Sequence, residues 1–467
     1  MSTEQPSRRG RRDTRRRRGY LSAFAIVLGL LVIVGVGAGA AVALQGPRVT
    51  AEQFDPQAAV SASGSRLILT MSQPLAPIEP EQVTVSPAAE TTVVTSGRSI
   101  GLQFALPLRD DTTYTVTISD VTGSGGGPAA TITRTFRTPP LSVFVLSRGD
   151  GEDTVFRTGL TGTEAVPVFT HPHIEDFRAT ASALVISTRD DDRPQLIVTD
   201  LEGQAERTLR LPGDGDGTVA ELQSADRGDL IGYTYTDADM TAEDAQASVL
   251  YTASVKPADA DAEPTPVQVA DQPVSAAAWR FVPDTDSILV LSFEGRLLLA
   301  AADGGDPVDL GDASGIQGIA RGSAIAVIQR PDGLYTIDLA DGTTEHLTQA
   351  TGVEGYLGRV VPLPDGATLQ QFTATGRSDV YLVAPDGSAE QVFGVGGTDA
   401  LLRTCVSPSG RYGAFLVQPD AASNPYRTGY DLPLPEIVDT HIVDLDDGSE
   451  VSVLAASGIS WCQVPAS

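Results

Sequence analysis

One unit recurs along the chain from residue 141 onward: an apolar strand, a turn rich in Asp and Gly, and a second strand. Seven copies occur at intervals of roughly 40–60 residues, over residues 155–162, 196–203, 250–255, 297–304, 334–342, 380–387 and 441–448. Repeats near 40–50 residues with about four strands each are typical of β-propeller blades, which bury their faces by stacking. The sequence therefore predicts an all-β fold in which residues 140–467 form a seven-bladed β-propeller, with six or eight blades as alternatives.

The end of the chain indicates how such a ring would close. Residues 457–465 resemble the first strand of the last repeat, 401–408, and in both segments a proline follows a cysteine three residues later. The first repeat, from residue 141, lacks an innermost strand of its own. We therefore expect the C-terminal strand to complete blade one beside blade seven.

Cys405 and Cys462 are the only cysteines. Closure of the ring by the C-terminal strand would place them at equivalent positions on neighbouring inner strands. Two thiols on an exported chain favour one disulfide bond, and two unrelated buried thiols are the alternative. This repeat pattern resembles the TolB-like and WD-repeat-like propellers of bacterial envelope proteins. The resemblance lies in architecture and turn chemistry, because the chain contains no Trp-Asp dipeptide.

Residues 45–139 predict a separate β-sandwich. Short segments of alternating, β-branched sequence are separated by Pro or Gly turns, at residues 66–71, 82–86, 91–95, 99–104 and 114–119. The segments SQPL (72–75), PEQVTV (80–85), LPLRDDTTYTV (106–116) and TFRT (135–138) resemble the bacterial Ig-like domain of S-layer and other envelope proteins. That resemblance implies a spacer or a binding module without catalytic residues.

The N-terminus predicts a membrane anchor. Eight arginines in the first 18 residues precede 24 uncharged residues, 21–44, which as a helix would span a bilayer core of ~30 Å. Because arginine-rich flanks stay in the cytoplasm, we expect a basic cytoplasmic tail at 1–20 and a transmembrane helix at 21–44. The expected localisation is a single-pass plasma-membrane protein with its bulk extracytoplasmic. A cleavable signal peptide ending near residues 41–43, or a twin-arginine signal at 17–21, is the alternative.

Charge limits the choice of partner. Beyond residue 20 the chain carries 24 basic against 58 acidic residues. A surface this acidic repels nucleic acid and anionic lipids, so no nucleic-acid partner is expected.

Three motifs suggest ligands, and each has a simpler explanation. Alternate residues of an extended segment share one face, so His171 and His173 could bind a metal together with the nearby Glu175 and Asp176. The alternative is that these residues belong to a polar loop. Residues 213–217 resemble part of a calcium loop, but such acidic turns are expected by chance at this composition. Residues 148–150 match a cell-adhesion tripeptide that is also ordinary turn chemistry. We therefore expect no metal and no cofactor.

Nothing indicates a catalytic centre: the sequence has no H-E-x-x-H motif and no P-loop, so we expect no enzyme. Two loops, residues 237–248 and 419–438, are longer than a blade needs, and both join second to third strands, so they would emerge on one face. Four residues of the latter are candidate partner-binding residues: Tyr426, Arg427, Tyr430 and Leu432. The alternative is a loop that packs onto its own blade.

These observations predict a non-catalytic binding or scaffold protein that recruits an envelope protein or a cell-wall glycan. One alternative is a hydrolase or lyase of cell-wall polymers with its site in the central propeller pocket. Another is a sensor of solutes or cations.

Overall fold

The computed structural model describes residues 24, 26–32, 46–191, 193–226, 229–242, 245–302 and 305–465. These residues divide into two compact units. The first comprises the described parts of Met1–Phe54 together with Arg66–Gln103 and Thr113–Phe136. The second comprises Asp55–Ser65, Phe104–Thr112 and the described parts of Arg137–Ser467.

The predicted membrane anchor needs correction. A helix needs about 20 residues to cross a bilayer, whereas Phe24 and residues 26–32 are the helical residues that the structure describes between residues 1 and 45. Among all described residues, no helix is long and apolar enough for a membrane span. The predicted localisation as a single-pass plasma-membrane protein is therefore wrong. The remainder of the predicted helix at 21–44, and the basic tail at 1–20, lie outside the described residues.

The first unit contains two antiparallel sheets. The larger sheet has the order β1 (Val49–Gln53), β2 (Arg66–Met71), β5 (Ser99–Phe104) and β4 (Thr91–Ser96). The smaller sheet has the order β3 (Val83–Ser86), β6 (Thr113–Val121) and β7 (Ala130–Arg137), and a short 3₁₀ helix, η1 (Pro80–Gln82), precedes β3. Every second residue is buried in β2, β5 and the first half of β6. This alternation is typical of sheets that cover a core with one face.

The second unit contains seven four-stranded antiparallel sheets among its described residues, numbered here 1 to 7 along the chain. Sheet 1 consists of β37 (Gly458–Ile459), β8 (Ser142–Arg148), β9 (Asp153–Gly159) and β10 (Val166–His171), and sheet 2 of β11 (Ile174–Ala179), β12 (Ala183–Asp190), β13 (Arg193–Asp200) and β14 (Arg207–Leu209). Sheet 3 consists of β15 (Thr218–Ser224), β16 (Leu230–Thr236), β17 (Val249–Ser254) and β18 (Thr265–Pro266), and sheet 4 of β21 (Ala276–Phe281), β22 (Ser287–Ser292), β23 (Arg296–Ala301) and β24 (Val308–Asp312).

In the remaining sheets, too, four consecutive strands pair in the order in which they follow one another along the chain. Sheet 5 consists of β25 (Gly315–Ile319), β26 (Ile325–Arg330), β27 (Gly333–Asp338) and β28 (Thr344–His346), and sheet 6 of β29 (Tyr356–Pro362), β30 (Thr368–Ala374), β31 (Arg377–Val383) and β32 (Ala389–Gly396). Sheet 7 consists of β33 (Ala400–Val406), β34 (Tyr412–Gln418), β35 (Asp439–Asp444) and β36 (Glu450–Ala455). The unit also contains α2 (Pro56–Ser61), the 3₁₀ helix η2 (Pro257–Asp259) and a hairpin of β19 (Gln268–Val269) and β20 (Gln272–Pro273).

Apolar cores join each sheet to the next. The second strand of a sheet is buried on both faces, as in β34, where all seven residues are buried. Separate clusters of buried apolar side chains connect sheets 1 and 2, 2 and 3, 3 and 4, 4 and 5, 5 and 6, 6 and 7, and finally 7 and 1. Sheets stacked face to face in a closed cycle define a β-propeller.

Turn chemistry explains why the repeat is visible in the sequence. Three turns between third and fourth strands read Asp-Gly-Thr or Asp-Gly-Ser, at residues 341–343, 386–388 and 447–449. In each turn the Asp carboxylate accepts the amide hydrogen of the residue two positions on, at 2.8–2.9 Å. The Gly between them has φ of 68–85°, which disfavours side chains with a Cβ. The pKa of Asp341, Asp386 and Asp447 is lowered by a hydrogen bond from the hydroxyl group of that Thr or Ser and, second, by the amide hydrogen bond.

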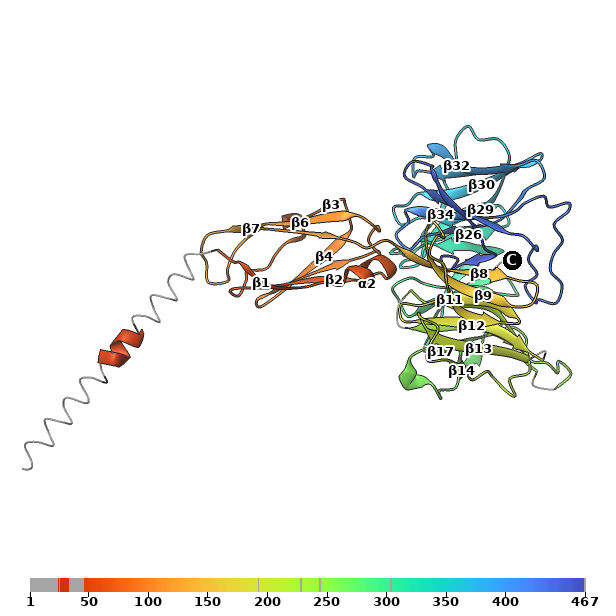
Figure 1. Cartoon of the computed structure of the whole chain (residues 1–467), viewed down its shortest axis with the longest axis horizontal. Coiled ribbons are helices and arrows are strands. Elements are labelled where there is room, and N and C mark those ends of the chain that lie inside the picture. The colour runs from red at the N-terminus through yellow and green to blue at the C-terminus, as the bar shows by residue number, and fades with distance from the viewer. Residues whose placement is uncertain are drawn as a thin grey trace, which may run out of the picture. The chain divides into compact units, whose positions relative to one another are not determined.

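The C-terminal strand closes the ring, as the sequence predicts. Strand β37 pairs antiparallel with β8, with Gly458 opposite Leu146 and Ile459 opposite Val145, and Figure 1 shows the end of the chain beside β8. The predicted disulfide is confirmed: Cys405 of β33 is bonded to Cys462, with 5.0 Å between their Cα atoms. Sheets 7 and 1 are therefore joined both covalently and through a shared core.

Candidate functional site

The first strands of the sheets surround the axis of the ring. Contacts run from β11 to β15, then to β21, β25, β29 and β33 in turn, and the disulfide links β33 to the segment that follows β37. Side chains that project from these strands toward the axis therefore share one central channel. Four of them are arginines, each on a different first strand: Arg178 on β11, Arg280 on β21, Arg359 on β29 and Arg403 on β33.

Arg280, Arg359 and Arg403 line one cavity, and Arg403 lines another together with Arg178, so we call these four residues the arginine cluster. The pKa of Arg403 is lowered to about 9, first by burial and then by the positive charge of Arg178, with Arg359 and Arg280 adding to the effect. The pKa of Arg280 is lowered to about 10, mainly by burial, and the charges of Arg359 and Arg178 contribute. Each shift reflects the cost of holding like charges together in a poorly solvated place.

The carboxylates near the cluster neutralise part of its charge. Arg178 donates to both carboxylate oxygens of Asp176, at 2.7 and 2.8 Å, and Glu221 raises the pKa of Arg280. In the part of the chain that the structure describes, Asp176 thus pairs with Arg178, and Glu221 acts on Arg280. Among the described residues, Nη2 of Arg403 and Nε of Arg178 are buried without a hydrogen-bond partner. Unpaired buried donors are costly, so these two nitrogen atoms, of Arg403 and Arg178, lower the stability of the fold.

Residues of the arginine cluster line two cavities. An open cavity of about 910 Å³ includes Arg280, Arg359, Arg330 and Tyr356 in its lining, together with Glu221 and several glutamine amides. It lies where first strands begin, because its lining includes the start of β29 and the loop between β26 and β27. Tyr356 is 75% exposed at this end. We call this space the channel mouth.

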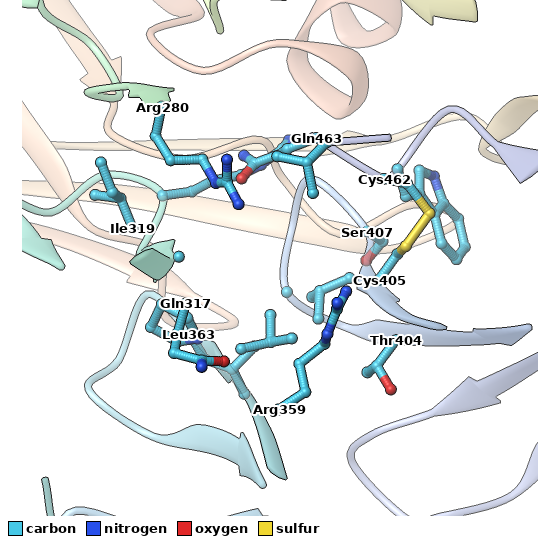
Figure 2. A pocket seen from close by; sticks show the side chains of 18 of the residues that line it. Arg280, Gln317, Ile319, Arg359, Leu363, Thr404, Cys405, Ser407, Cys462 and Gln463 are labelled. Carbon is cyan, nitrogen blue, oxygen red and sulfur yellow. A yellow bond between two sulfur atoms is a disulfide. The ribbon is translucent and has the colours of Figure 1, made fainter. Parts of the chain in front are cut away.

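A smaller cavity of about 80 Å³ lies toward the other ends of the first strands. Arg280 and Arg359 line it as well as the channel mouth, and its lining also includes Arg403, Arg321, Gln317 and the Cys405–Cys462 disulfide. Figure 2 shows Arg280 and Arg359 reaching into this cavity from different strands, with the disulfide at its edge. A ligand in either cavity could therefore contact both arginines.

The chemistry of the lining favours binding. Guanidinium groups donate paired hydrogen bonds that match carboxylate and phosphate oxygens, and amides fix orientation. The described residues that line the two cavities include no histidine, and Glu221 and Asp332 are their carboxylates. Asp332 accepts a hydrogen bond of 2.8 Å from the hydroxyl of Tyr335. This arrangement can bind and orient an anion.

The sequence did not indicate the arginine cluster, because a β-bulge interrupts the pairing of each of these four strands. The register shifts between Ile174 and Asp176, Ala276 and Ala278, Leu357 and Val360, and Leu401 and Arg403. A bulge shifts the pairing by one residue and so changes which side chains face the axis. The alternation of residues along the sequence therefore no longer predicts which side chains point into the channel. The available signal was an arginine within each of four first strands.

The predicted partner-binding residues lie in the long loop, residues 419–438, between β34 and β35. Tyr426 is 50% exposed. Arg427 instead donates to the backbone oxygen of Gly149 at 3.1 Å and to Asp150 at 3.3 Å. Leu432 donates its amide hydrogen to Glu175 at 3.2 Å.

Tyr430 packs most closely of the four. Its ring lies 4.2 Å from the ring of His173, and the guanidinium of Arg148 lies 3.9 Å above it. Its hydroxyl donates to Asp153. The long loop therefore docks on sheet 1 and on the start of sheet 2, and of the four candidates Tyr426 is the most exposed.

The remaining motifs have structural roles. His173 lies 2.6 Å from Glu175, and among the described residues no group of three or more His, Cys, Asp or Glu side chains could hold a metal. Arg148 of the adhesion-like tripeptide is buried and donates to the Glu175 backbone. Residues 97–101 read G-x-S-x-G, but they form the turn and start of a β-hairpin between β4 and β5, not the strand-to-helix turn of a nucleophile.

Comparisons with known proteins show similarity at the level of fold. No protein-family model and no curated protein matches this sequence. Solved structures with similarity include TolB from Acinetobacter baumannii (12% identity, TM-score 0.36, covering 79% of each chain). They also include apo AztD from Citrobacter koseri (12% identity, TM-score 0.39, 69% of this chain and 96% of that chain). An uncharacterized protein from Listeria monocytogenes EGD-e has 9% identity and a TM-score of 0.40, over 66% of this chain and 90% of that chain. At these values we assign the propeller from sheet order and shared cores, and take nothing about function from the similarities.

Proposed function

We propose that this chain is a non-catalytic binding or scaffold protein whose ligand enters the channel mouth. In this proposal the seven sheets are the blades of one seven-bladed propeller, and the two sheets of the first unit are an Ig-like spacer. The observation that carries it is the open cavity of about 910 Å³ on the axis, lined by three arginines and several amides. Ligand sites in ring-shaped folds favour such concave, pre-formed spaces with a few convergent polar groups.

Two further features support binding at this end of the ring. The long loop and residues 237–248 both connect second to third strands, so both emerge at the end where first strands begin. Exposed apolar side chains accompany them there, namely Tyr356, Phe293, Met240 and Tyr426. Aromatic side chains around a polar cavity are typical of recognition surfaces. An envelope protein or a cell-wall glycan is the class of partner that we propose.

A cavity-filling variant tests this proposal. Ala277 is exposed and lines the channel mouth, so Ala277→Trp should obstruct it without altering a core. Ala389 is an exposed alanine on the outer strand β32, so Ala389→Trp is the matched control. Thermal shifts of the wild type and both variants are measured against a library of cell-wall glycan fragments and small metabolites. We expect at least one compound to stabilise the wild type and Ala389→Trp but not Ala277→Trp. Absence of any such compound, or equal stabilisation of Ala277→Trp, would refute the proposal.

The alternative of a polymer hydrolase or lyase makes a different prediction. General acid–base cleavage of a glycoside needs two carboxyl groups on opposite sides of the bond, and among the described residues Glu221 and Asp332 are the carboxylates that line the channel mouth. Turnover of a bound glycan that Glu221→Gln abolishes would favour the enzyme.

A further inference from the structure

A third cavity, of about 20 Å³, has walls from sheets 1, 2 and 7. Strands β8, β11, β33 and β37 contribute to its lining, and the long loop adds Leu432 and Leu434. Three arginines line this cavity, each from a different sheet: Arg148 of β8, Arg178 of β11 and Arg403 of β33. All three are buried, with exposed fractions of 7%, 3% and 6% respectively. We call this space the three-arginine cavity.

Each of these arginines keeps one buried N–H group without an acceptor among the described residues. The nitrogens are Nε of Arg148, Nε of Arg178 and Nη2 of Arg403. The two Nη atoms of Arg148 are used elsewhere, because they donate to the backbone oxygens of Leu432 and Glu175 at 3.0 and 2.8 Å. Buried donors without partners are rare and costly in folded proteins. Three of them on residues of one lining therefore point to an acceptor inside the cavity.

Two carboxylates also line the three-arginine cavity, and both are engaged by other donors. The two oxygens of Asp176 accept from the Nη atoms of Arg178, at 2.7 and 2.8 Å. The two oxygens of Glu175 accept the amide hydrogen of Asp431 at 3.0 Å, and Oε1 lies 2.6 Å from Nε2 of His173. Within the described lining, the acceptor for the three N–H groups is therefore not a carboxylate of the protein.

The size of the cavity selects the ligand. About 10–15 Å³ is enough for one water molecule, so a cavity of about 20 Å³ holds one small particle and excludes carboxylate, phosphate and sulfate groups. A water molecule must also direct its own two hydrogens to acceptors. A halide ion accepts hydrogen bonds from several directions and donates none, and its charge strengthens each bond. We infer that the three-arginine cavity binds a single chloride ion between Arg148, Arg178 and Arg403.

The expected role of this ion is to join sheets where the ring closes. Burial lowers the pKa of Arg148 and of Arg403, and a bound anion offsets the cost of holding a guanidinium group out of water. The lining also includes Cys462, whose disulfide links sheet 7 to the segment that follows β37. An ion that binds the folded chain alone stabilises it. This role goes beyond the proposed function, because the cavity shares no described lining residue with the channel mouth.

Thermal unfolding of the full chain provides the test, after purification in sodium gluconate. Chloride replaces gluconate stepwise at constant ionic strength, so that screening of surface charges stays the same. We expect chloride to raise the Tm of the wild type by at least about 2 °C, along a curve that saturates with concentration. Bromide should act as chloride does, whereas sulfate of equal ionic strength should not, because it is too large for the cavity.

Two variants and their controls separate the site from general salt effects. Arg403→Leu removes one of the three donors and should lose most of the chloride shift, whereas Arg377→Leu removes an exposed guanidinium from β31 and should keep it. Gly458→Ala should also reduce the shift. A Cβ at Gly458 would lie 3.7 Å from Leu146 and from Phe177, which line the same cavity, so a methyl group narrows the space without a clash. Gly159→Ala, on β9, is its control, because a Cβ there meets nothing within 4 Å.

Anomalous scattering locates the ion. Crystals of the wild type grown in sodium bromide should show an anomalous peak within hydrogen-bond distance of the three guanidinium groups, and crystals of Arg403→Leu should lack it. Equal chloride shifts in the wild type, Arg403→Leu and Gly458→Ala would overturn the inference, as would bromide peaks confined to other sites, and either result would assign the cavity to a water molecule. Such a failure leaves the proposed function intact, because Ala277→Trp tests a different cavity.

Discussion

The Tyr430 hydroxyl lies 2.9 and 3.1 Å from the two carboxylate oxygens of Asp153 and donates to them, although 277 residues separate the two in sequence. Asp153 is fully buried and also accepts the amide hydrogen of Ile174 at 2.8 Å. Tyr430 thus connects the long loop of sheet 7 to the boundary between sheets 1 and 2. The loop is a second fastening of the ring, in addition to β37 and the disulfide.

Removing this hydroxyl should lower stability. Tyr430→Phe keeps the ring contact with His173 but leaves the buried Asp153 carboxylate short of a donor. We expect the free energy of unfolding in urea to fall by about 1–3 kcal/mol. Tyr426→Phe changes a half-exposed ring of the same loop and should stay within about 0.5 kcal/mol of the wild type. Equal effects of the two substitutions would show that Tyr430 does not fasten the loop.

The same tyrosine makes stability depend on alkaline pH. Burial, followed by the hydrogen bond to Asp153, raises the pKa of Tyr430 to about 12, from an ordinary value of 10.0. Because the folded state holds this proton more tightly than the unfolded chain, the contribution is fully present below pH 10 and is lost as pH rises through about 12. Urea unfolding at intervals between about pH 9 and 12 should therefore show a shallower decline in Tyr430→Phe than in the wild type. Parallel declines would mean that other tyrosines account for all of the loss.

The Cys405–Cys462 bond should contribute a large part of the stability of the propeller. It closes a loop with a sequence separation of 57 residues, so its loss should lower the free energy of unfolding by about 2–4 kcal/mol. The variant Cys405→Ser/Cys462→Ser is compared with the wild type in urea, with and without reductant.

Reductant serves as the internal control for that comparison, because the chain has no other cysteines. It should destabilise the wild type to the level of the double variant and leave the double variant unchanged. A double variant as stable as the oxidised wild type would contradict the assigned role in ring closure.

The sequence predicts the ring well because its determinants are local. Asp-Gly turns require particular residues at particular positions, as at 341–343, and apolar second strands follow from burial on both faces. The spacing of proline after Cys405 and Cys462 likewise reveals that two first strands are equivalent. Each of these signals depends on a few consecutive residues.

The candidate site could not be predicted because its determinants are not local. Whether Arg359 faces the axis depends on the bulge between Leu357 and Val360, which is a property of strand pairing. Arg427 likewise donates a hydrogen bond to the backbone oxygen of Gly149, which lies 278 residues away in sequence. Composition predicted a surface that repels nucleic acid and anionic lipids, whereas the fold places a minority of basic residues around the channel.

Replacing Arg403 should stabilise the protein if the arginine cluster exists for binding. Arg403→Leu removes a buried charge that lies beside three like charges and carries an unsatisfied donor. We expect the free energy of unfolding to rise by about 1 kcal/mol or more. Arg377→Leu, at an exposed ion pair on β31, should leave the free energy of unfolding nearly unchanged. A marked loss of stability in Arg403→Leu would instead make this arginine a structural element of the channel wall.

Replacing Asp176 should lower the stability of the protein, because its carboxylate neutralises the buried charge of Arg178. Asp176→Asn leaves Arg178, which is 3% exposed, without its two charged acceptors. We expect the free energy of unfolding to fall by about 3–5 kcal/mol. The double variant Asp176→Asn/Arg178→Met removes both charges and should recover most of that loss, which a double-mutant cycle in urea measures as a coupling energy. Additive effects of the two substitutions would show that Asp176 does not balance the charge of Arg178.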